Sequence, residues 1–248
     1  MDPKEIPTRQ HSAWIAWLPL FWIVLGLLFS SVALRSTIPL WPGSVLGLET
    51  FIDASSGGRS ASGLDTSNGD LHLAVRLDSG AKWPVAGAIL TLAPHGMGLD
   101  LSAPGKLRLD LDTGNLASLQ ICLVEEIPDF TVEDQWQTAR YDCQELDMTP
   151  GQSSYALPLE HFLTPEWWYS NAKVDLAKLG PEKRQGVVRM ILQSGGGTPL
   201  RDLREVRISR MDVRSLHWMR AEAILGSFLL LSLANFLLIL RARRRKQA

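Results

Sequence analysis

Residues that carry catalysis or bind metals are scarce in this sequence. Its 248 residues include two cysteines and five histidines, and the histidines are scattered along the chain. A Gly-x-Ser-x-Gly nucleophile motif, a Cys-x-x-Cys pair and a His-Glu-x-x-His helix are all absent. The glycine-rich stretch Ser194–Thr198 lacks the Lys-Ser/Thr that a phosphate loop requires. The sequence therefore predicts a protein that is not an enzyme, with no metal site and no cofactor.

Neighbouring carboxylates occur twice, as Glu125-Glu126 and as Glu133-Asp134. A glycosidase needs two carboxyl groups about 5–9 Å apart across a cleft. Adjacent residues of a strand point to opposite faces of the sheet, so neighbours in sequence make poor catalytic pairs. We therefore expect a solvated acidic loop here. A periplasmic hydrolase acting on polysaccharide is the third hypothesis for function, behind two that are not enzymatic.

A long apolar run lies near the end of the chain and is followed by positive charges. Ala223–Leu240 contains 18 residues without a charge, and a helix of that length rises about 27 Å, close to the hydrocarbon thickness of a bilayer. Five Lys or Arg residues follow within 241–248. By the positive-inside rule, this end of the chain is cytoplasmic.

A second apolar run lies near the start of the chain. Ala13–Leu34 has 22 residues without a charge, and the tryptophans in its first half suit the headgroup region of a bilayer. The run is longer than the core of a signal peptide, which is about 7–15 residues, and this favours an uncleaved transmembrane helix. A signal peptide cleaved near Ser31-Val32-Ala33 is the alternative.

Two transmembrane spans define the expected topology. The predicted segments are a cytoplasmic tail (1–12), a first transmembrane helix (13–34), a linker (35–44), a β-sandwich domain (45–214), an interfacial segment with the second transmembrane helix (215–240) and a basic cytoplasmic tail (241–248). We expect a two-pass protein of the bacterial inner membrane with both termini cytoplasmic and the main domain periplasmic. Residues 35–219 carry 17 Lys or Arg against 23 Asp or Glu. This acidic balance argues against nucleic acid as a partner, whereas the basic tail suits the lipid bilayer.

The section between the two apolar runs has the pattern of an all-β domain. Apolar and polar residues alternate, or short apolar runs recur, with Gly, Pro, Asp and Ser between them, as expected for an antiparallel sandwich. The predicted strands are Leu71–Leu77, Lys106–Asp112, Leu119–Val124, Val187–Gln193 and Glu205–Met211. Two short helices are predicted at Leu159–Leu163 and Asn171–Leu179.

The order of these patterns resembles the galactose-binding-like jelly rolls, in the branch that contains family 11 carbohydrate-binding modules and complex I intermediate-associated proteins. The features that carry the resemblance are Phe51-Ile52-Asp53, a strand pair across Ala86–Leu92, the step Leu99–Ser102, the segment Tyr155–Leu159 and the glycine-rich loop before the last strand. The resemblance covers about 45–214. It implies a jelly-roll β-sandwich that binds or scaffolds and does not catalyse.

Cys122 and Cys143 are expected on neighbouring strands joined by the connection Glu125–Ala139. Outside the cytoplasm, an even number of cysteines permits a disulfide. Two buried free thiols are the alternative. The sequence alone leaves both states open.

An aromatic cluster is the main candidate for a ligand-binding site. Its members are Trp136, Trp167, Trp168 and Tyr169. Flat rings with polar edges suit the faces of sugars and the centres of protein interfaces alike. In the alternative, these rings close one end of the sandwich or rest on the membrane surface.

Asn235 is the strongly polar residue within the second apolar run, and an amide in lipid gains about 0.6–2 kcal/mol by bonding to a neighbouring helix. We therefore predict a transmembrane contact to the first helix or to a membrane-protein partner. The layout resembles bacterial membrane receptors. The leading hypothesis is a sensor or receptor module that binds a carbohydrate-like or envelope ligand and signals through its helices to a partner. The alternative is a structural or assembly subunit of a cell-envelope complex.

Overall fold

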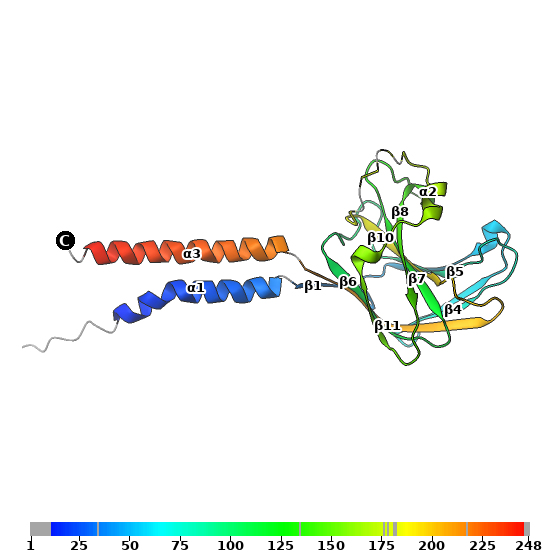
Figure 1. Cartoon of the computed structure of the whole chain (residues 1–248), viewed down its shortest axis with the longest axis horizontal. Helices are drawn as coiled ribbons and strands as arrows, with labels where there is room; N and C mark the ends of the chain where they lie inside the picture. The colour runs from blue at the N-terminus through cyan, green and yellow to red at the C-terminus, as the bar shows by residue number, and fades with distance from the viewer. Residues whose placement is uncertain are drawn as a thin grey trace, which may run out of the picture. The chain divides into compact units, whose positions relative to one another are not determined.

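The two ends of the chain form a pair of helices, and the residues between them form a β-sandwich (Figure 1). The computed structural model describes residues 11–33, 35–133, 135–175, 177, 179–180, 183–216 and 218–245. The helical unit contains α1 (His11–Ala33) and α3 (Trp218–Arg245). The sandwich unit spans Thr37–Ser215.

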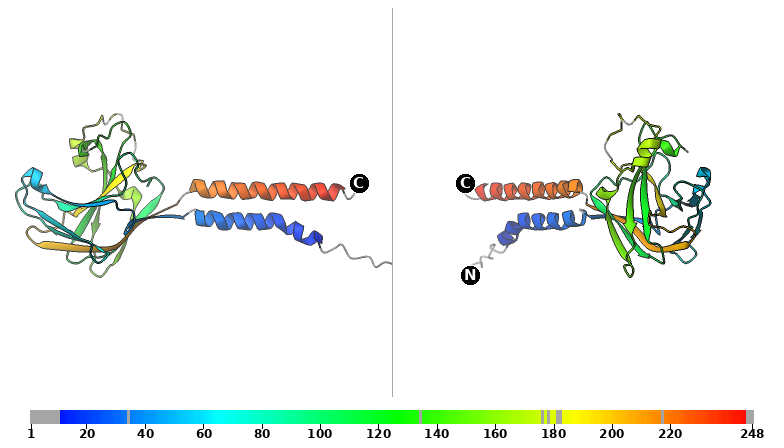
Figure 2. Two further views of the ribbon diagram at one scale, coloured as in Figure 1. Left: turned by 180° about the vertical axis from the view of Figure 1, so that it is seen from behind. Right: turned by 45° about the vertical axis from the view of Figure 1, so that its right-hand side comes forward.

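The sandwich consists of two sheets, which Figure 2 shows from two further sides. The six-stranded sheet has the order β3-β4-β11-β6-β9, with β1 paired to β11, and the five-stranded sheet has the order β2-β5-β10-β7-β8. The strands of the first are β1 (Arg35–Trp41), β3 (Ala61–Asp65), β4 (Leu71–Arg76), β6 (Gly105–Asp112), β9 (Ser154–Pro158) and β11 (Leu203–Leu216). Those of the second are β2 (Gly47–Ile52), β5 (Ala86–Thr91), β7 (Ser118–Glu125), β8 (Arg140–Asp147) and β10 (Val187–Ser194).

Alternation along the strands explains how the two sheets share one core. On β6, Leu107, Leu109 and Leu111 are buried, and the residues between them are more exposed. Both sheets contribute side chains of this kind to a single cluster. Burying a leucine side chain stabilises the fold by about 1.5–3 kcal/mol. Burial of the alternating apolar side chains is therefore the main interaction that holds the two sheets together. The predicted β-sandwich is confirmed, as are the strands that correspond to β4, β6, β7, β10 and β11.

The prediction of a linker at 35–44 is wrong, because most of this segment forms β1. Leu40 is fully buried and Ile38 packs against the main core, so this segment belongs to the sandwich. Pro39 lacks an N–H group, and β1 has a single strand neighbour, β11, which leaves one edge without ladder bonds. A proline fits such a strand.

Three further predictions about local structure are corrected. Ala86–Leu92 forms one strand, β5, with β2 and β10 on either side, and not a pair of strands. The predicted helix Leu159–Leu163 is a 3₁₀ turn, η3 (Leu159–His161). The second predicted helix, Asn171–Leu179, is also misplaced. The helix in this region is α2 (Glu166–Asn171), and it ends at Asn171. The Asn171 side chain donates to the Trp167 carbonyl oxygen at 2.6 Å, which satisfies a carbonyl group in the last turn of α2.

A second, smaller core lies on the face of the five-stranded sheet that points away from the main core. It contains Cys122, Val124, Ala139, Tyr141, Cys143 and Trp168. Residues of β7 alternate between the two cores, because Ile121 and Leu123 belong to the main core while Cys122 and Val124 belong to the second. Trp168 of α2 packs on this face. We call it the outer face of the five-stranded sheet.

Among the described residues, one helix is long and apolar enough to cross a membrane, Glu222–Arg241 within α3. In α1 the apolar stretch Trp17–Ser30 is shorter. The second predicted span is therefore consistent with the structure, whereas the first remains a prediction.

Close packing joins α1 to α3. A Cβ atom on Gly26 would lie 2.6 Å from the Cβ atom of Phe228, so the glycine permits the approach of the two helices. The Phe228 ring stacks on Phe29, with 5.9 Å between centroids, and lies 6.0 Å from Trp22. Small residues at such contacts are typical of helices that pack in membranes.

The side-chain hydrogen bond of Asn235 lies within α3. Its amide donates at 3.0 Å to the Leu231 carbonyl oxygen of its own helix. Ser232 makes the polar contact between helices, because its hydroxyl group donates to the Pro19 carbonyl oxygen of α1 at 3.1 Å. Asn235 lies three residues further along α3, about 60° around the helix axis from Ser232, so the two residues share one side of the helix. Contact of Asn235 with α1 or with a partner's helix remains a prediction.

Candidate functional site

Three aromatic rings meet on the outer face of the five-stranded sheet, and we call them the ring cluster. Trp136 comes from η2 (Trp136–Thr138), Tyr141 from β8 and Trp167 from α2. The Tyr141 centroid lies 6.3 Å from that of Trp136 and 5.6 Å from that of Trp167, and the tryptophan centroids lie 6.4 Å apart. Tyr141 is buried, whereas Trp136 and Trp167 remain 45% and 41% exposed. The buried ring therefore supports two rings that face solvent.

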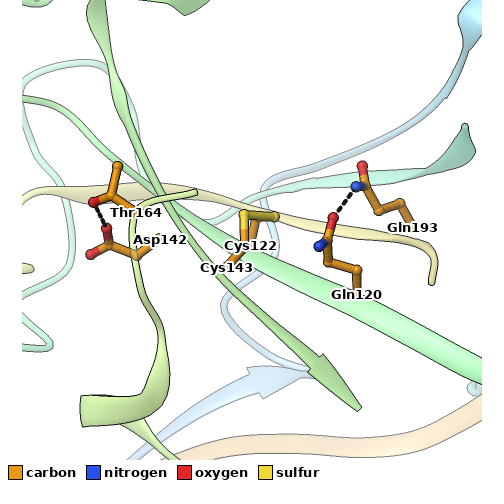
Figure 3. The surroundings of a disulfide bond; sticks show 6 residues. All are labelled: Gln120, Cys122, Asp142, Cys143, Thr164 and Gln193. Atoms are coloured by element: carbon orange, nitrogen blue, oxygen red, sulfur yellow. Dashed lines mark hydrogen bonds between the residues drawn. A yellow bond between two sulfur atoms is a disulfide. The ribbon is translucent and has the colours of Figure 1, made fainter. Parts of the chain in front are cut away.

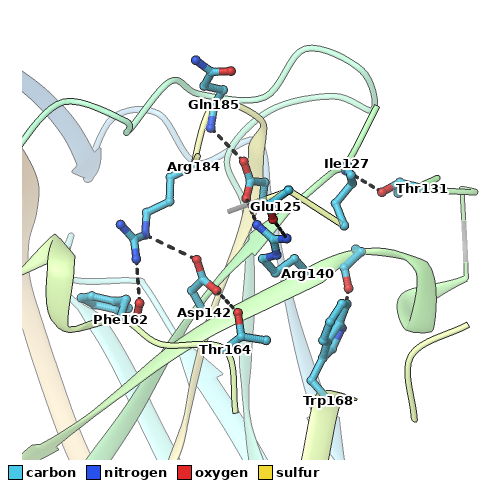
Figure 4. Close-up of polar contacts among 12 residues, drawn as sticks. Glu125, Ile127, Thr131, Arg140, Asp142, Phe162, Thr164, Trp168, Arg184 and Gln185 are labelled. Carbon is cyan, nitrogen blue, oxygen red and sulfur yellow. Dashed lines mark hydrogen bonds and ion pairs between the residues drawn. The ribbon is translucent and has the colours of Figure 1, made fainter. Parts of the chain in front are cut away.

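Trp168 departs from the prediction that it binds a ligand. Its side chain is completely buried, and its Nε1–H group donates to the Ala139 carbonyl oxygen at 2.6 Å (Figure 4). Consecutive residues of a helix point in directions about 100° apart, so Trp167 and Trp168 cannot occupy the same surface. Tyr169 is exposed and contacts the edge of Trp168, with 5.4 Å between centroids. Trp168 therefore holds α2 on the sheet. Tyr169 contacts Trp168 and is not part of the ring cluster.

A pocket of about 110 Å³ opens beside the ring cluster. Trp136 and Tyr141 line one side, and the loop after β5 lines another. Arg189 lies at its floor, between Thr91 of β5 and Val124 of β7. A β-bulge shifts the register between Val187 and Arg189, so Val187 faces the main core while Arg189 faces outward. Bulges of this kind often redirect side chains at functional sites.

His95 and Glu126 form an ion pair on the wall of this pocket. The Nδ1 atom of His95 lies 2.7 Å from the Glu126 carboxylate, whose second oxygen accepts from the Gly96 N–H group at 2.7 Å. The hydrogen bond to Glu126, together with its negative charge, raises the pKa of His95 above its usual value. The imidazole therefore remains protonated to a higher pH than a free histidine does.

The expectation of a solvated acidic loop is wrong for Glu125, because this side chain is buried. It is paired with Arg140 across β7 and β8, with 3.7 Å between the carboxylate and the guanidinium, and its other oxygen accepts from the Gln185 N–H group (Figure 4). Burial raises the pKa of Glu125, although Gln185 and Arg140 oppose this effect. A second pair joins Asp142 to Arg184 at 3.4 Å. These four charged side chains stabilise one end of the sandwich and leave Glu126 at the pocket.

Cys122 and Cys143 form a disulfide between directly paired positions of β7 and β8 (Figure 3). On the same face, the Gln193 side chain donates to the side-chain oxygen of Gln120. The disulfide belongs to the second core beneath Trp168. It therefore connects the two strands that support the ring cluster.

The structure brings together two of the four predicted ligand-binding residues, Trp136 and Trp167. Sequence reasoning missed Tyr141 and Arg189 and gave His95 no partner, because their neighbours lie on other strands and loops. Glu126 follows His95 by 31 residues, for example. Among the described residues, no three His, Cys, Asp or Glu side chains are grouped so that they could hold a metal ion.

Comparisons with known proteins give structural likeness without sequence likeness. No protein-family model and no curated protein matches the chain. The chain is similar to a family 11 carbohydrate-binding module from Clostridium thermocellum in complex with a β-1,3-1,4-mixed-linked tetrasaccharide, with 9% identity, a TM-score of 0.48, and 72% of this chain and 94% of that one covered. It is also similar to a family 30 carbohydrate-binding module (14% identity, TM-score 0.43, 73% and 99% covered) and to the xylan-binding module CBM15 (12%, 0.40, 73% and 97%). The function of this chain is therefore argued below from its own site.

Proposed function

We propose that the sandwich binds a saccharide on the outer face of its five-stranded sheet. The observation that carries this proposal is the pair of half-exposed rings, Trp136 and Trp167, supported by Tyr141. The face of an aromatic ring carries negative charge density, which attracts the polarised C–H groups on one face of a pyranose ring. The neighbouring pocket supplies polar groups for sugar hydroxyls.

The rings also have little freedom left to lose when a ligand binds. The Trp136 and Trp167 rings pack against the buried Tyr141 ring, and Trp167 lies on a helix that the adjacent Trp168 fixes to the sheet. Ordering a free side chain at an interface costs about 0.5–1.5 kcal/mol. A preformed pair of rings avoids much of this cost.

The test is a binding measurement on the full chain in detergent micelles, with a panel of glucans, xylans, chitin fragments and acidic oligosaccharides. Trp136→Ala and Trp167→Ala are each expected to weaken binding by tenfold or more, about 1.4 kcal/mol or more, as for an aromatic anchor at a binding surface. Trp83→Ala is the matched control, because Trp83 is 77% exposed and does not line the pocket. A saccharide bound equally well by all three variants would overturn the proposal.

We further propose that α3 anchors the sandwich in a membrane, with the basic residues after the span on the cytoplasmic side. The length and composition of Glu222–Arg241 support anchoring, and the charges that follow support the orientation. Protease added to intact spheroplasts should digest the sandwich, and protection of the sandwich would contradict this topology.

Signalling through the helices also remains a prediction. Ligand-dependent crosslinking between α1 and α3 is the measurement that tests it.

A further inference from the structure

Arg189 lies at the floor of the pocket, and no described residue pairs with its charge. It is half-buried, and it makes no ion pair or hydrogen bond with any described residue. Two other arginines near this sheet are paired: the buried Arg140 with Glu125, and the partly buried Arg184 with Asp142. A partly buried guanidinium loses hydration without gaining a counter-charge, so it favours a ligand that supplies one.

Two more polar groups lie beside Arg189 with hydrogen-bonding capacity to spare. The Tyr141 hydroxyl group has no hydrogen-bond partner among the described residues, and both Tyr141 and His95 line the same pocket. Burial raises the pKa of Tyr141 while Arg189 opposes that rise, and Arg189 likewise opposes the rise in the pKa of His95. Arg189, Tyr141 and His95 all line this one pocket, which brings the guanidinium near both groups. Because Nδ1 of His95 is held by Glu126, its Nε2 atom is left for a ligand.

These three side chains favour a ligand group that accepts hydrogen bonds and donates none. Arg189 and Tyr141 donate hydrogen bonds, and Nε2 of His95 also donates when the imidazole is protonated. A carboxylate accepts on both oxygens and matches the fork of a guanidinium. The pocket, at about 110 Å³, is smaller than the roughly 300–1,000 Å³ of whole-ligand sites, so it suits a substituent of a larger ligand.

Two carboxylates also line this pocket, and they bear on its charge. Glu126 already accepts from His95 and from the Gly96 N–H group, so its charge is largely compensated. Glu133 is exposed to solvent, which screens its repulsion of an incoming anion. Among the described residues of the pocket, Arg189 therefore carries the charge that is least compensated.

We propose that Arg189, Tyr141 and His95 form a carboxylate subsite, and that the saccharide bound at the ring cluster contains a uronic acid. The pyranose lies against Trp136 and Trp167, and its carboxylate enters the pocket. This inference rests on the proposed function, because it names the class of saccharide that the same site takes. Protonation of His95 adds a third donor, so binding strengthens as the pH falls through the pKa of His95 while the uronate stays ionised.

The test compares charged and neutral forms of one saccharide on the full chain in detergent micelles. Trimers of galacturonic, glucuronic and mannuronic acid are titrated beside their methyl esters, which keep the sugar rings and lose the charge. One trimer is expected to bind at least tenfold more tightly than its ester. Arg189→Gln should remove that difference, because it replaces the cation by a neutral amide. Arg207→Gln is the control, since Arg207 is exposed on β11 of the other sheet and the change in charge is the same.

The outcomes separate this inference from the proposed function. Binding of neutral saccharides that depends on Trp136, with no preference for the acid and no effect of Arg189→Gln, overturns the carboxylate subsite and leaves the proposed function standing. A titration with tricarballylate, a carboxylate probe without sugar rings, tests whether the subsite binds a carboxylate when no saccharide binds. Binding of tricarballylate that depends on Arg189, with no saccharide bound, supports the subsite and overturns the proposed function. Absence of binding by every probe overturns both.

Discussion

Trp168 and Trp136 should respond to substitution in opposite ways, although sequence reasoning grouped them together. The Trp168 side chain is completely buried in the second core and donates to the Ala139 carbonyl oxygen. Trp168→Phe keeps an aromatic ring, but it removes that hydrogen bond and leaves a small cavity. An unsatisfied buried carbonyl costs about 1–3 kcal/mol, so we expect a loss of about 2–3 kcal/mol once the cavity is included.

Thermal unfolding measures this loss directly. For a domain of this size, 1 kcal/mol shifts the melting temperature by about 2–4 °C, so Trp168→Phe should lower it by roughly 4–12 °C. Saccharide affinity of the variant that remains folded should change less than threefold, because Trp168 presents no surface to a ligand. Trp136→Ala should leave the melting temperature within about 2 °C, because Trp136 is half-exposed, and should weaken saccharide binding by tenfold or more. A Trp168→Phe protein with unchanged melting and lost binding would refute this reasoning.

Three other predictions concern the helix pair, the buried charges and the pocket. Gly26→Leu should separate α1 from α3, because its side chain would overlap Phe228, whereas Gly226→Leu should be tolerated because no atom lies within 4 Å of a Cβ there; crosslinking between the helices distinguishes the two. Arg140→Met should destabilise the sandwich by about 3–5 kcal/mol by leaving Glu125 buried without its counter-charge, and adding Glu125→Leu should recover most of that loss in denaturant unfolding. The pKa of His95 is raised, so the stability from its pairing with Glu126 is fully present below about pH 6.5 and is lost as the pH rises through the folded-state pKa. Glu126→Gln should move the NMR titration of His95 back towards its ordinary value, and an unshifted titration would contradict this.

The sequence predicts the sandwich because burial follows a period of two along its strands. Leu107, Leu109 and Leu111 show the pattern in full, and each contributes to the main core. The segment that forms β1 is hard to recognise as a strand because it contains Pro39, although a strand with one free edge accepts a proline. The six-residue helix α2 is too short to give a helical period, so pattern reasoning could not separate the buried Trp168 from the exposed Trp167.

The site is harder to predict, because its parts come from distant segments. Trp136 and Trp167 were identified by residue type, but Tyr141 supports them only through the pairing of β7 with β8 and the position of α2. Arg189 faces outward by the alternation of β10, in which Met190 and Leu192 face the main core, but the sequence does not show that it meets Tyr141 and His95 there. Glu125 and Glu126 look alike in sequence. Glu125, the last residue of β7, is buried against Arg140, and Glu126, just after the strand, lies at the pocket.

A crystal structure of the full chain with a bound oligosaccharide tests the central claim most directly. We expect a pyranose ring in van der Waals contact with Trp136 and Trp167 on the outer face of the five-stranded sheet. A saccharide bound instead on the six-stranded sheet, or at the exposed Trp83, would contradict it.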